Sequence, residues 1–162
     1  MGVMNNIVAQ NPDYLFMIES ACKAPSGHNT QPWLFKIGAS EIDIYPDFSK
    51  ELPIVDPSHR ELFVSLGCAT ENLCIAAHEK GYHTEVKVIE NSFIRVLLTE
   101  GKEKLPDSLL FPQIAVRQTN KRVYNGEAIP ESTINILKMV PIEPSVSIHF
   151  YRNGTVDYDG TY

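Results

Sequence analysis

The sequence lacks an excess of positive charge. Lys and Arg number 14 against 20 Asp and Glu, which leaves a formal net charge of −6. Nucleic acids and anionic membrane surfaces reward clustered basic residues, so this balance argues against both as main partners. The longest apolar run is also far short of the ~20 residues that span a bilayer. We therefore expect no nucleic-acid partner and no membrane partner.

Cysteine is scarce, and no two cysteines form a Cys-x-x-Cys pair. The three cysteines, Cys22, Cys68 and Cys74, are an odd number, which is typical of a reducing compartment. No basic segment followed by an apolar stretch opens the sequence. We therefore expect a cytoplasmic protein. The five histidines show no ligand spacing, so we expect no metal site.

The length of 162 residues fits one domain with a real core. Apolar periodicity and turn residues predict an alternation of helices and strands. The predicted order is a helix from Pro12 to about Cys22, strands over 33–37 and 41–45, a long helix ending at Gly81, strands over 84–90 and 93–99, helices over 106–116 and 130–139, and a strand over 146–150. This order indicates an α+β fold with an antiparallel or mixed sheet packed against helices.

The long central helix has two alternative starts. Asp56 could cap it with Pro57 at the first helical position, or Ser58 could cap it with Glu61 closing a capping box. Apolar and small residues then recur at spacings of three and four. We expect Leu73 on this helix to lie in the core.

The segment from Ala24 to Trp33 is the most informative one. It holds two prolines, a glycine, several short polar side chains and the single tryptophan. Such a rigid loop, with exposed N–H groups and short donors, suits a flat, polar, anionic cofactor. Trp33 itself is more typical of a core residue than of a ligand contact. Ser26 near His28 could suggest a hydrolase, but no third member of a triad is evident.

A second polar segment runs from Arg117 to Arg122. It places three cations and three neutral hydrogen-bonding side chains in six residues of an acidic chain. Each of the two guanidinium groups can present a planar fork to a phosphate, and Thr119 can add a hydroxyl. The alternative is a solvated surface turn.

The two segments and the central helix together resemble the FMN-dependent nitroreductase-like family. The motifs that carry the resemblance are Ala24-Pro25-Ser26-x-x-Asn29-x-Gln31-Pro32-Trp33, the small-residue helix Leu66-Gly67-x-Ala69-x-x-Asn72-Leu73-x-x-Ala76-Ala77, and Arg117-x-Thr119-x-x-Arg122. The resemblance extends from about Tyr14 to Tyr124 and is strongest in the first two motifs.

The resemblance implies a nitroreductase-like sandwich that forms a homodimer with FMN at the subunit interface. The implied cofactor-binding residues are Pro25, Ser26, Asn29 and Gln31 along the ribityl chain and ring, and Arg117, Thr119 and Arg122 at the phosphate. NAD(P)H would reduce the flavin and a quinone or nitroaromatic-like acceptor would reoxidise it, with no catalytic nucleophile or base from the protein. A flavin-binding protein without turnover and a cofactor-free dimeric scaffold are the alternatives.

The order of the motifs departs from ordinary members of that family. The basic segment follows the Ser-Asn loop instead of preceding it, and a new helix begins soon afterwards, at Pro130. This order is most similar to the tandem branch, in which two degenerate halves share one chain. We therefore expect residues 1–112 to form a first half and residues 113–162 the start of a second, in a truncated or naturally shortened chain with an incomplete fold.

Overall fold

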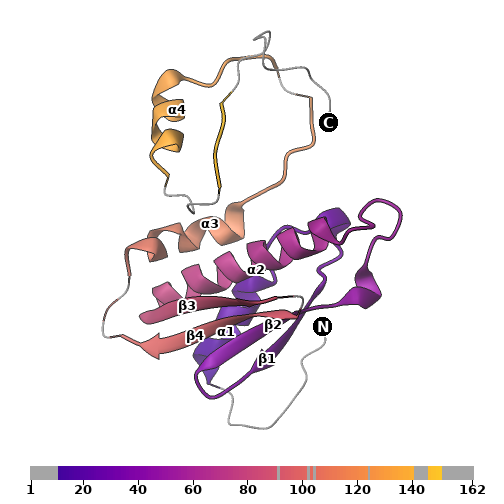
Figure 1. Cartoon of the computed structure of the whole chain (residues 1–162). Helices are drawn as coiled ribbons and strands as arrows, with labels where there is room; N and C mark the ends of the chain where they lie inside the picture. Colours follow the sequence, from indigo (N-terminus) through magenta and orange to yellow (C-terminus); the bar gives the residue numbers. More distant parts are fainter. Residues whose placement is uncertain are drawn as a thin grey trace. The chain divides into compact units, whose positions relative to one another are not determined.

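The computed structural model describes residues 11–90, 92–101, 103, 105–123, 125–140 and 146–150. The chain divides into two compact units, Met1–Thr119 and Asn120–Tyr162, which are described separately (Figure 1). The expected halves, 1–112 and 113–162, remain a prediction.

The first unit contains the sheet and most of the helices. Its elements are α1 (Pro12–Ala21), η1 (Gly27–Asn29), β1 (Trp33–Ile37), β2 (Glu41–Pro46), η2 (Phe48–Lys50), α2 (Arg60–Glu79), β3 (Tyr82–Ile89), β4 (Phe93–Glu100), η3 (Pro106–Leu110) and α3 (Phe111–Val116). The four strands are arranged in the order β1-β2-β4-β3, and every neighbouring pair is antiparallel. The predicted α+β class is confirmed, with the antiparallel form of the sheet.

One face of the sheet supplies the core. Ile42 and Ile44 on β2 and Val96 on β4 are fully buried, because alternate residues of a strand point to the same face. Helix α2 packs on this sheet and contributes Leu66 and Leu73, which are also fully buried. The core position expected for Leu73 is therefore confirmed.

The opposite face of the sheet carries a charged pair between strands. Asp43 on β2 lies directly across from Arg95 on β4, and its two carboxylate oxygens accept bonds of 2.7 and 2.8 Å from the guanidinium group. These hydrogen bonds to Asp43 raise the pKa of Arg95 above its ordinary value. The forked contact joins β2 to β4 at one of their directly paired positions.

Helix α1 begins as its sequence predicts. The side chain of Asn11 accepts a 3.0 Å bond from the Asp13 amide, and Pro12 occupies the first turn. The helix packs beside α2, where the Asn72 side-chain amide donates to the Ser20 carbonyl at 3.2 Å. Asn72 is thus a satisfied polar group at a contact between helices.

The start of α2 differs from both predicted alternatives. The helix begins at Arg60 after His59, whose φ of 57° is left-handed, so neither Asp56 nor Ser58 is the capping residue itself. The buried Asp56 carboxylate nevertheless reaches forward and accepts a 2.9 Å bond from the Leu62 amide. Burial raises the pKa of Asp56, but bonds from the Leu62, Glu61 and Arg60 amides outweigh it and the net pKa is lowered.

The predicted end of α2 at Gly81 is confirmed. Its φ of 82° is left-handed, and a Cβ there would approach the Glu103 carbonyl oxygen to 3.3 Å. Both facts favour glycine at this helix end. The predicted hairpin follows as β3 and β4, and the predicted helix over 106–116 divides into η3 and α3. Helix α3 is anchored by Phe111, whose ring lies 5.1 Å from that of Phe16.

The second unit contains α4 (Glu131–Lys138), as predicted. The predicted strand over 146–150 is wrong, because these residues form no strand. Val146, Ile148 and Phe150 alternate as in a strand, but their side chains are 53%, 48% and 39% exposed. A strand is stable only beside a partner that completes its backbone hydrogen bonds, and alternation alone does not supply one.

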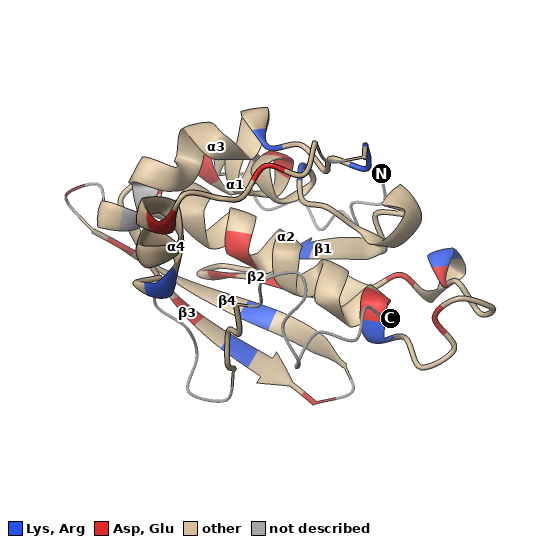
Figure 2. Ribbon diagram, turned by 90° about the horizontal axis from the view of Figure 1, so that it is seen from above, with Lys and Arg blue, Asp and Glu red and all other residues tan. Residues whose placement is uncertain are grey.

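Basic and acidic residues are interspersed along the described parts of the ribbon (Figure 2). No helix among the described residues has the length and apolar character needed to cross a membrane.

Candidate functional site

The 24–33 loop, which connects α1 to β1, has an unusual backbone. Three of its non-glycine residues, His28, Asn29 and Gln31, have left-handed φ angles of 48°, 57° and 52°. This region costs an L-residue about 1–2 kcal/mol. Such strain persists only where surrounding contacts enforce it, and it concentrates at binding and catalytic sites.

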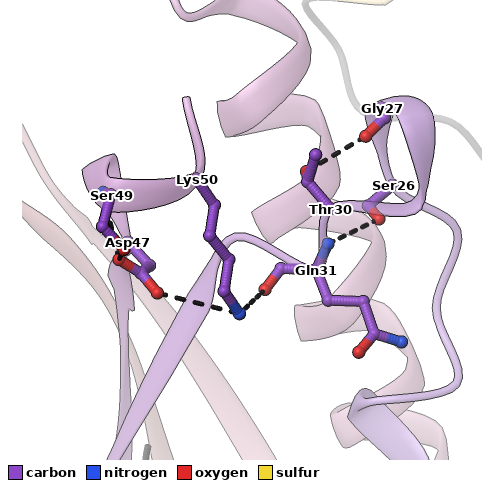
Figure 3. A network of polar contacts seen from close by, with 7 residues as sticks. All are labelled: Ser26, Gly27, Thr30, Gln31, Asp47, Ser49 and Lys50. Atoms are coloured by element: carbon purple, nitrogen blue, oxygen red, sulfur yellow. Dashed lines mark hydrogen bonds and ion pairs between the residues drawn. The ribbon is translucent and has the colours of Figure 1, made fainter. Parts of the chain in front are cut away.

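Hydrogen bonds within the loop enforce part of this conformation (Figure 3). The Ser26 hydroxyl oxygen accepts a 2.9 Å bond from the Gln31 amide, and the Ser26 carbonyl accepts a 3.0 Å bond from the Asn29 amide. The Gly27 carbonyl accepts bonds from both the amide and the hydroxyl of Thr30, each at 3.0 Å. The loop is therefore a closed set of short turns.

Contacts with other elements also hold the loop in this conformation. The Gly27 amide donates a 3.2 Å bond to the Ser65 hydroxyl on α2, and a Cβ at Gly27 would lie 2.9 Å from a Glu61 carboxylate oxygen. This position therefore allows the loop to approach α2 closely. On the other side, Lys50 Nζ donates a 3.1 Å bond to the Gln31 carbonyl.

The loop presents polar groups to solvent. Asn29 and Gln31 are exposed, while Pro25 and Ser26 are half-buried. The Gln31 side chain makes one long bond of 3.4 Å to the Cys22 carbonyl. Among the described residues no acceptor meets the Ser26 hydroxyl hydrogen, so this group can still donate. Trp33 is buried, which confirms its predicted place in the core.

A shallow pocket adjoins the inner side of the loop. Its lining comes from the loop, η2 and the segment after it, and the first turns of α2. It includes Gly27, Thr30, Lys50, Leu52, Leu62 and Ser65. The pocket shows that the turn after β2 and the start of α2 lie next to the loop.

The turn after β2 is itself ordered by a carboxylate. Asp47 Oδ1 accepts bonds from the Ser49 amide at 3.1 Å and the Ser49 hydroxyl at 2.5 Å, and Asp47 Oδ2 lies 3.7 Å from Lys50 Nζ. The bonds from Ser49, followed by the charge of Lys50, hold the pKa of Asp47 below its ordinary value. The Asp47 amide in turn donates to the Pro32 carbonyl at 3.0 Å, which joins this turn to the loop.

The predicted phosphate residues divide between the two units. Arg117 follows α3 in the first unit, where its guanidinium donates a 3.3 Å bond to the Thr119 hydroxyl, and both residues are exposed. Arg122 is exposed in the second unit, where its amide donates to the Asn120 side chain at 3.0 Å. Within the described residues, no hydrogen bond or ion pair joins Arg117 to the 24–33 loop.

Other candidate chemistry finds little support in the structure. Burial raises the pKa of the Cys74 thiol to about 11, so this cysteine is a protonated packing group at neutral pH. Ser26 and His28 share no hydrogen bond in the described part of the chain, and His28 is exposed. The described residues also contain no group of three or more His, Cys, Asp or Glu side chains placed to hold a metal ion.

Sequence reasoning missed Lys50, Asp47 and Ser65. They lie 14 or more residues beyond the loop in the chain, and only the folded arrangement of β1, β2 and α2 brings them to it. A weak signal was present, because the Asp-Phe-Ser-Lys segment reads as a turn in which Asp47 can bond to Ser49.

No family model matches the chain. It is similar to two proteins of Mycobacterium tuberculosis, from strains CDC 1551 and H37Rv, each named "Putative NAD(P)H nitroreductase". Identity to each is 30% over 122 residues, which cover 72% of this chain and 36% of the relative. The chain thus spans about a third of the length of these relatives. The similarity supports a nitroreductase-like family for the aligned region.

Proposed function

We propose that this chain is the flavin-binding part of an FMN-dependent NAD(P)H oxidoreductase of the nitroreductase type. The observation that carries the proposal is the strained 24–33 loop, which holds the polar side chains of Asn29 and Gln31 exposed on a rigid backbone. The names of the two relatives agree with it, and the acceptor would be a quinone or a nitroaromatic-like compound.

The residues fit the polar side of a flavin. Ser26 has a hydroxyl hydrogen to donate, and the amides of Asn29 and Gln31 can both donate and accept, as a ribityl chain and a flavin ring edge require. Pro25 lies at the start of this polar stretch and restricts the backbone there. The loop would orient the ring and exclude water from one of its sides. When bound, FMN supplies the hydride and electron transfer.

The phosphate would be held by Arg117, Thr119 and Arg122. An exposed guanidinium that already orients a hydroxyl at 3.3 Å presents two kinds of donor to one anion. In the described residues no carboxylate pairs with Arg117 or Arg122, although the chain is acidic. Both guanidinium groups are therefore available to an anionic ligand.

A homodimer, or the second half of a tandem chain, would supply the rest of the binding site. The 24–33 loop would be one side of a site, whereas a flat ring has two faces to cover. Helix α2 carries Phe63 and Val64 at 41% and 53% exposure, next to exposed Gly67. Apolar side chains beside a glycine suit close packing against a second helix.

Turnover by the purified protein tests the proposal. The protein is saturated with FMN, freed of excess flavin, and mixed with NADH or NADPH and either benzoquinone or nitrobenzene. We expect donor oxidation that depends on the acceptor and on bound flavin. A yellow protein that remains oxidised with both donors would contradict the enzyme and leave a flavin-binding protein without turnover. A colourless protein would contradict both and favour the cofactor-free scaffold.

A further inference from the structure

The turn at Asp47–Lys50 is joined to the most strained part of the 24–33 loop. Gln31 has a left-handed φ of 52°, and its carbonyl oxygen accepts a 3.1 Å bond from Lys50 Nζ. Figure 3 shows the Lys50 ammonium between this carbonyl and the Asp47 carboxylate, which lies 3.7 Å from it. The ammonium thus connects an acidic side chain to the backbone of the loop.

We infer that Lys50 is a positioning residue for the flavin-facing side of the loop, an inference that rests on the proposed function. The Lys50 side chain is 40% exposed, and its ammonium bonds to the Gln31 carbonyl and so orients the peptide between Gln31 and Pro32. The preceding peptide, between Thr30 and Gln31, donates through the Gln31 amide to Ser26 Oγ at 2.9 Å. Lys50 and Ser26 therefore hold the two peptide groups on either side of the Gln31 α-carbon, which together set its left-handed φ.

Asp47 makes this arrangement more rigid. Ser49 donates two bonds to one carboxylate oxygen of Asp47, which leaves the other oxygen facing Lys50. The Asp47 amide independently bonds to the Pro32 carbonyl, one residue after Gln31. The turn therefore bonds to two successive carbonyls of the loop, to that of Gln31 through the Lys50 side chain and to that of Pro32 through the Asp47 amide.

These contacts predict an effect on flavin affinity that does not depend on the phosphate. Lys50→Met keeps most of the aliphatic stem but removes the donor, whereas Lys50→Arg keeps a charged donor. If Lys50 positions the loop, Lys50→Met lowers the affinity for FMN and for riboflavin by the same factor, about fivefold or more. This is the effect of losing one charged hydrogen bond at a partly exposed site. Lys50→Arg restores most of the affinity.

Amide hydrogen exchange supplies a readout that needs no flavin. In Lys50→Met the peptides covering residues 26–33 exchange faster, whereas those of β3 and β4 keep their wild-type rates. The matched control is Lys87→Met, which removes the same charge from an exposed lysine on β3. It leaves both the exchange of residues 26–33 and the flavin affinity at wild-type values.

The outcomes separate this inference from the proposed function. The wild-type protein could bind no flavin while Lys50→Met still shows faster exchange. That result supports the contact between the turn and the loop, but it overturns both the flavin proposal and the positioning role toward flavin. Unchanged exchange overturns the inference whatever the flavin result. A loss of affinity confined to FMN, with riboflavin unaffected, also overturns it, because Lys50 would then act directly on the phosphate.

Discussion

Gln31→Gly is expected to stabilise the protein and to weaken its flavin binding. Gln31 has a φ of 52°, which costs a non-glycine residue about 1–2 kcal/mol. Glycine removes that cost but adds about 0.4–1 kcal/mol of unfolded-state freedom. The side-chain bond that is lost, 3.4 Å long and exposed, contributes little. The free energy of unfolding should therefore rise by about 0.5–1 kcal/mol, which is about 1–4 °C in Tm.

The matched variant is Gln31→Ala, which removes the same amide but retains the strained backbone. Its stability should stay within about 0.5 kcal/mol of the wild type. Flavin affinity should fall about two- to tenfold in both variants, the effect of losing one neutral hydrogen bond. Urea unfolding gives the stabilities, and quenching of flavin fluorescence gives the affinities.

The comparison between the two variants tests the reasoning. Stabilisation by glycine but not by alanine, with equal loss of affinity, would show that the strain exists and that the amide contacts flavin. A glycine variant that unfolds more easily than the alanine variant would refute the strained conformation. Unchanged flavin affinity in both would remove Gln31 from the binding site.

Three further variants, one of them double, test the phosphate site, the core and the start of α2. The double variant Arg117→Ala with Arg122→Ala should weaken FMN binding by about 1.5–3 kcal/mol per lost bond and leave the binding of riboflavin, which has no phosphate, unchanged in parallel titrations. An equal loss of affinity for both ligands would locate the phosphate elsewhere. Leu73→Ala should lower the free energy of unfolding by about 2–5 kcal/mol in urea, because the side chain is fully buried; a change below about 0.5 kcal/mol would contradict its core position. Asp56→Asn should destabilise the protein at neutral pH. Because the folded pKa of Asp56 is lowered, its contribution is present above the unfolded pKa of about 3.9 and is lost as pH falls through the folded pKa. Urea unfolding at pH 7, 5 and 3 should therefore show a shrinking difference from the wild type, and a constant difference would count against a stabilising bond from the Leu62 amide to the Asp56 carboxylate.

Much of the fold could be predicted because its signals are local. Asn11, Pro12 and Asp13 specify a helix start through their own side chains and φ preference, and Gly81 specifies a helix end. The two hairpins follow from period-two alternation on either side of short turns. These features need no knowledge of distant residues, which is why the elements of the first unit match the prediction closely.

The sequence-based predictions failed where contacts between residues far apart in the sequence determine the structure. Asp56 lies four residues before the first residue of α2 and accepts a bond from the Leu62 amide across an intervening turn that sequence spacing does not reveal. Residues 146–150 alternate like a strand, but a strand also requires a neighbour. Lys50 reaches the 24–33 loop only because β1 and β2 pair side by side. The residue types at the site could be read from the sequence, whereas the contacts that orient them could not.

The most direct test of the flavin-binding loop is an NMR titration of the uniformly ¹⁵N-labelled protein with FMN. A flavin-binding role for this loop predicts saturable shifts that are largest for the backbone amides of residues 26–31, Trp33 and Arg117, with smaller shifts on β3 and β4. Saturable shifts centred elsewhere, or a spectrum unchanged at excess FMN, would contradict it.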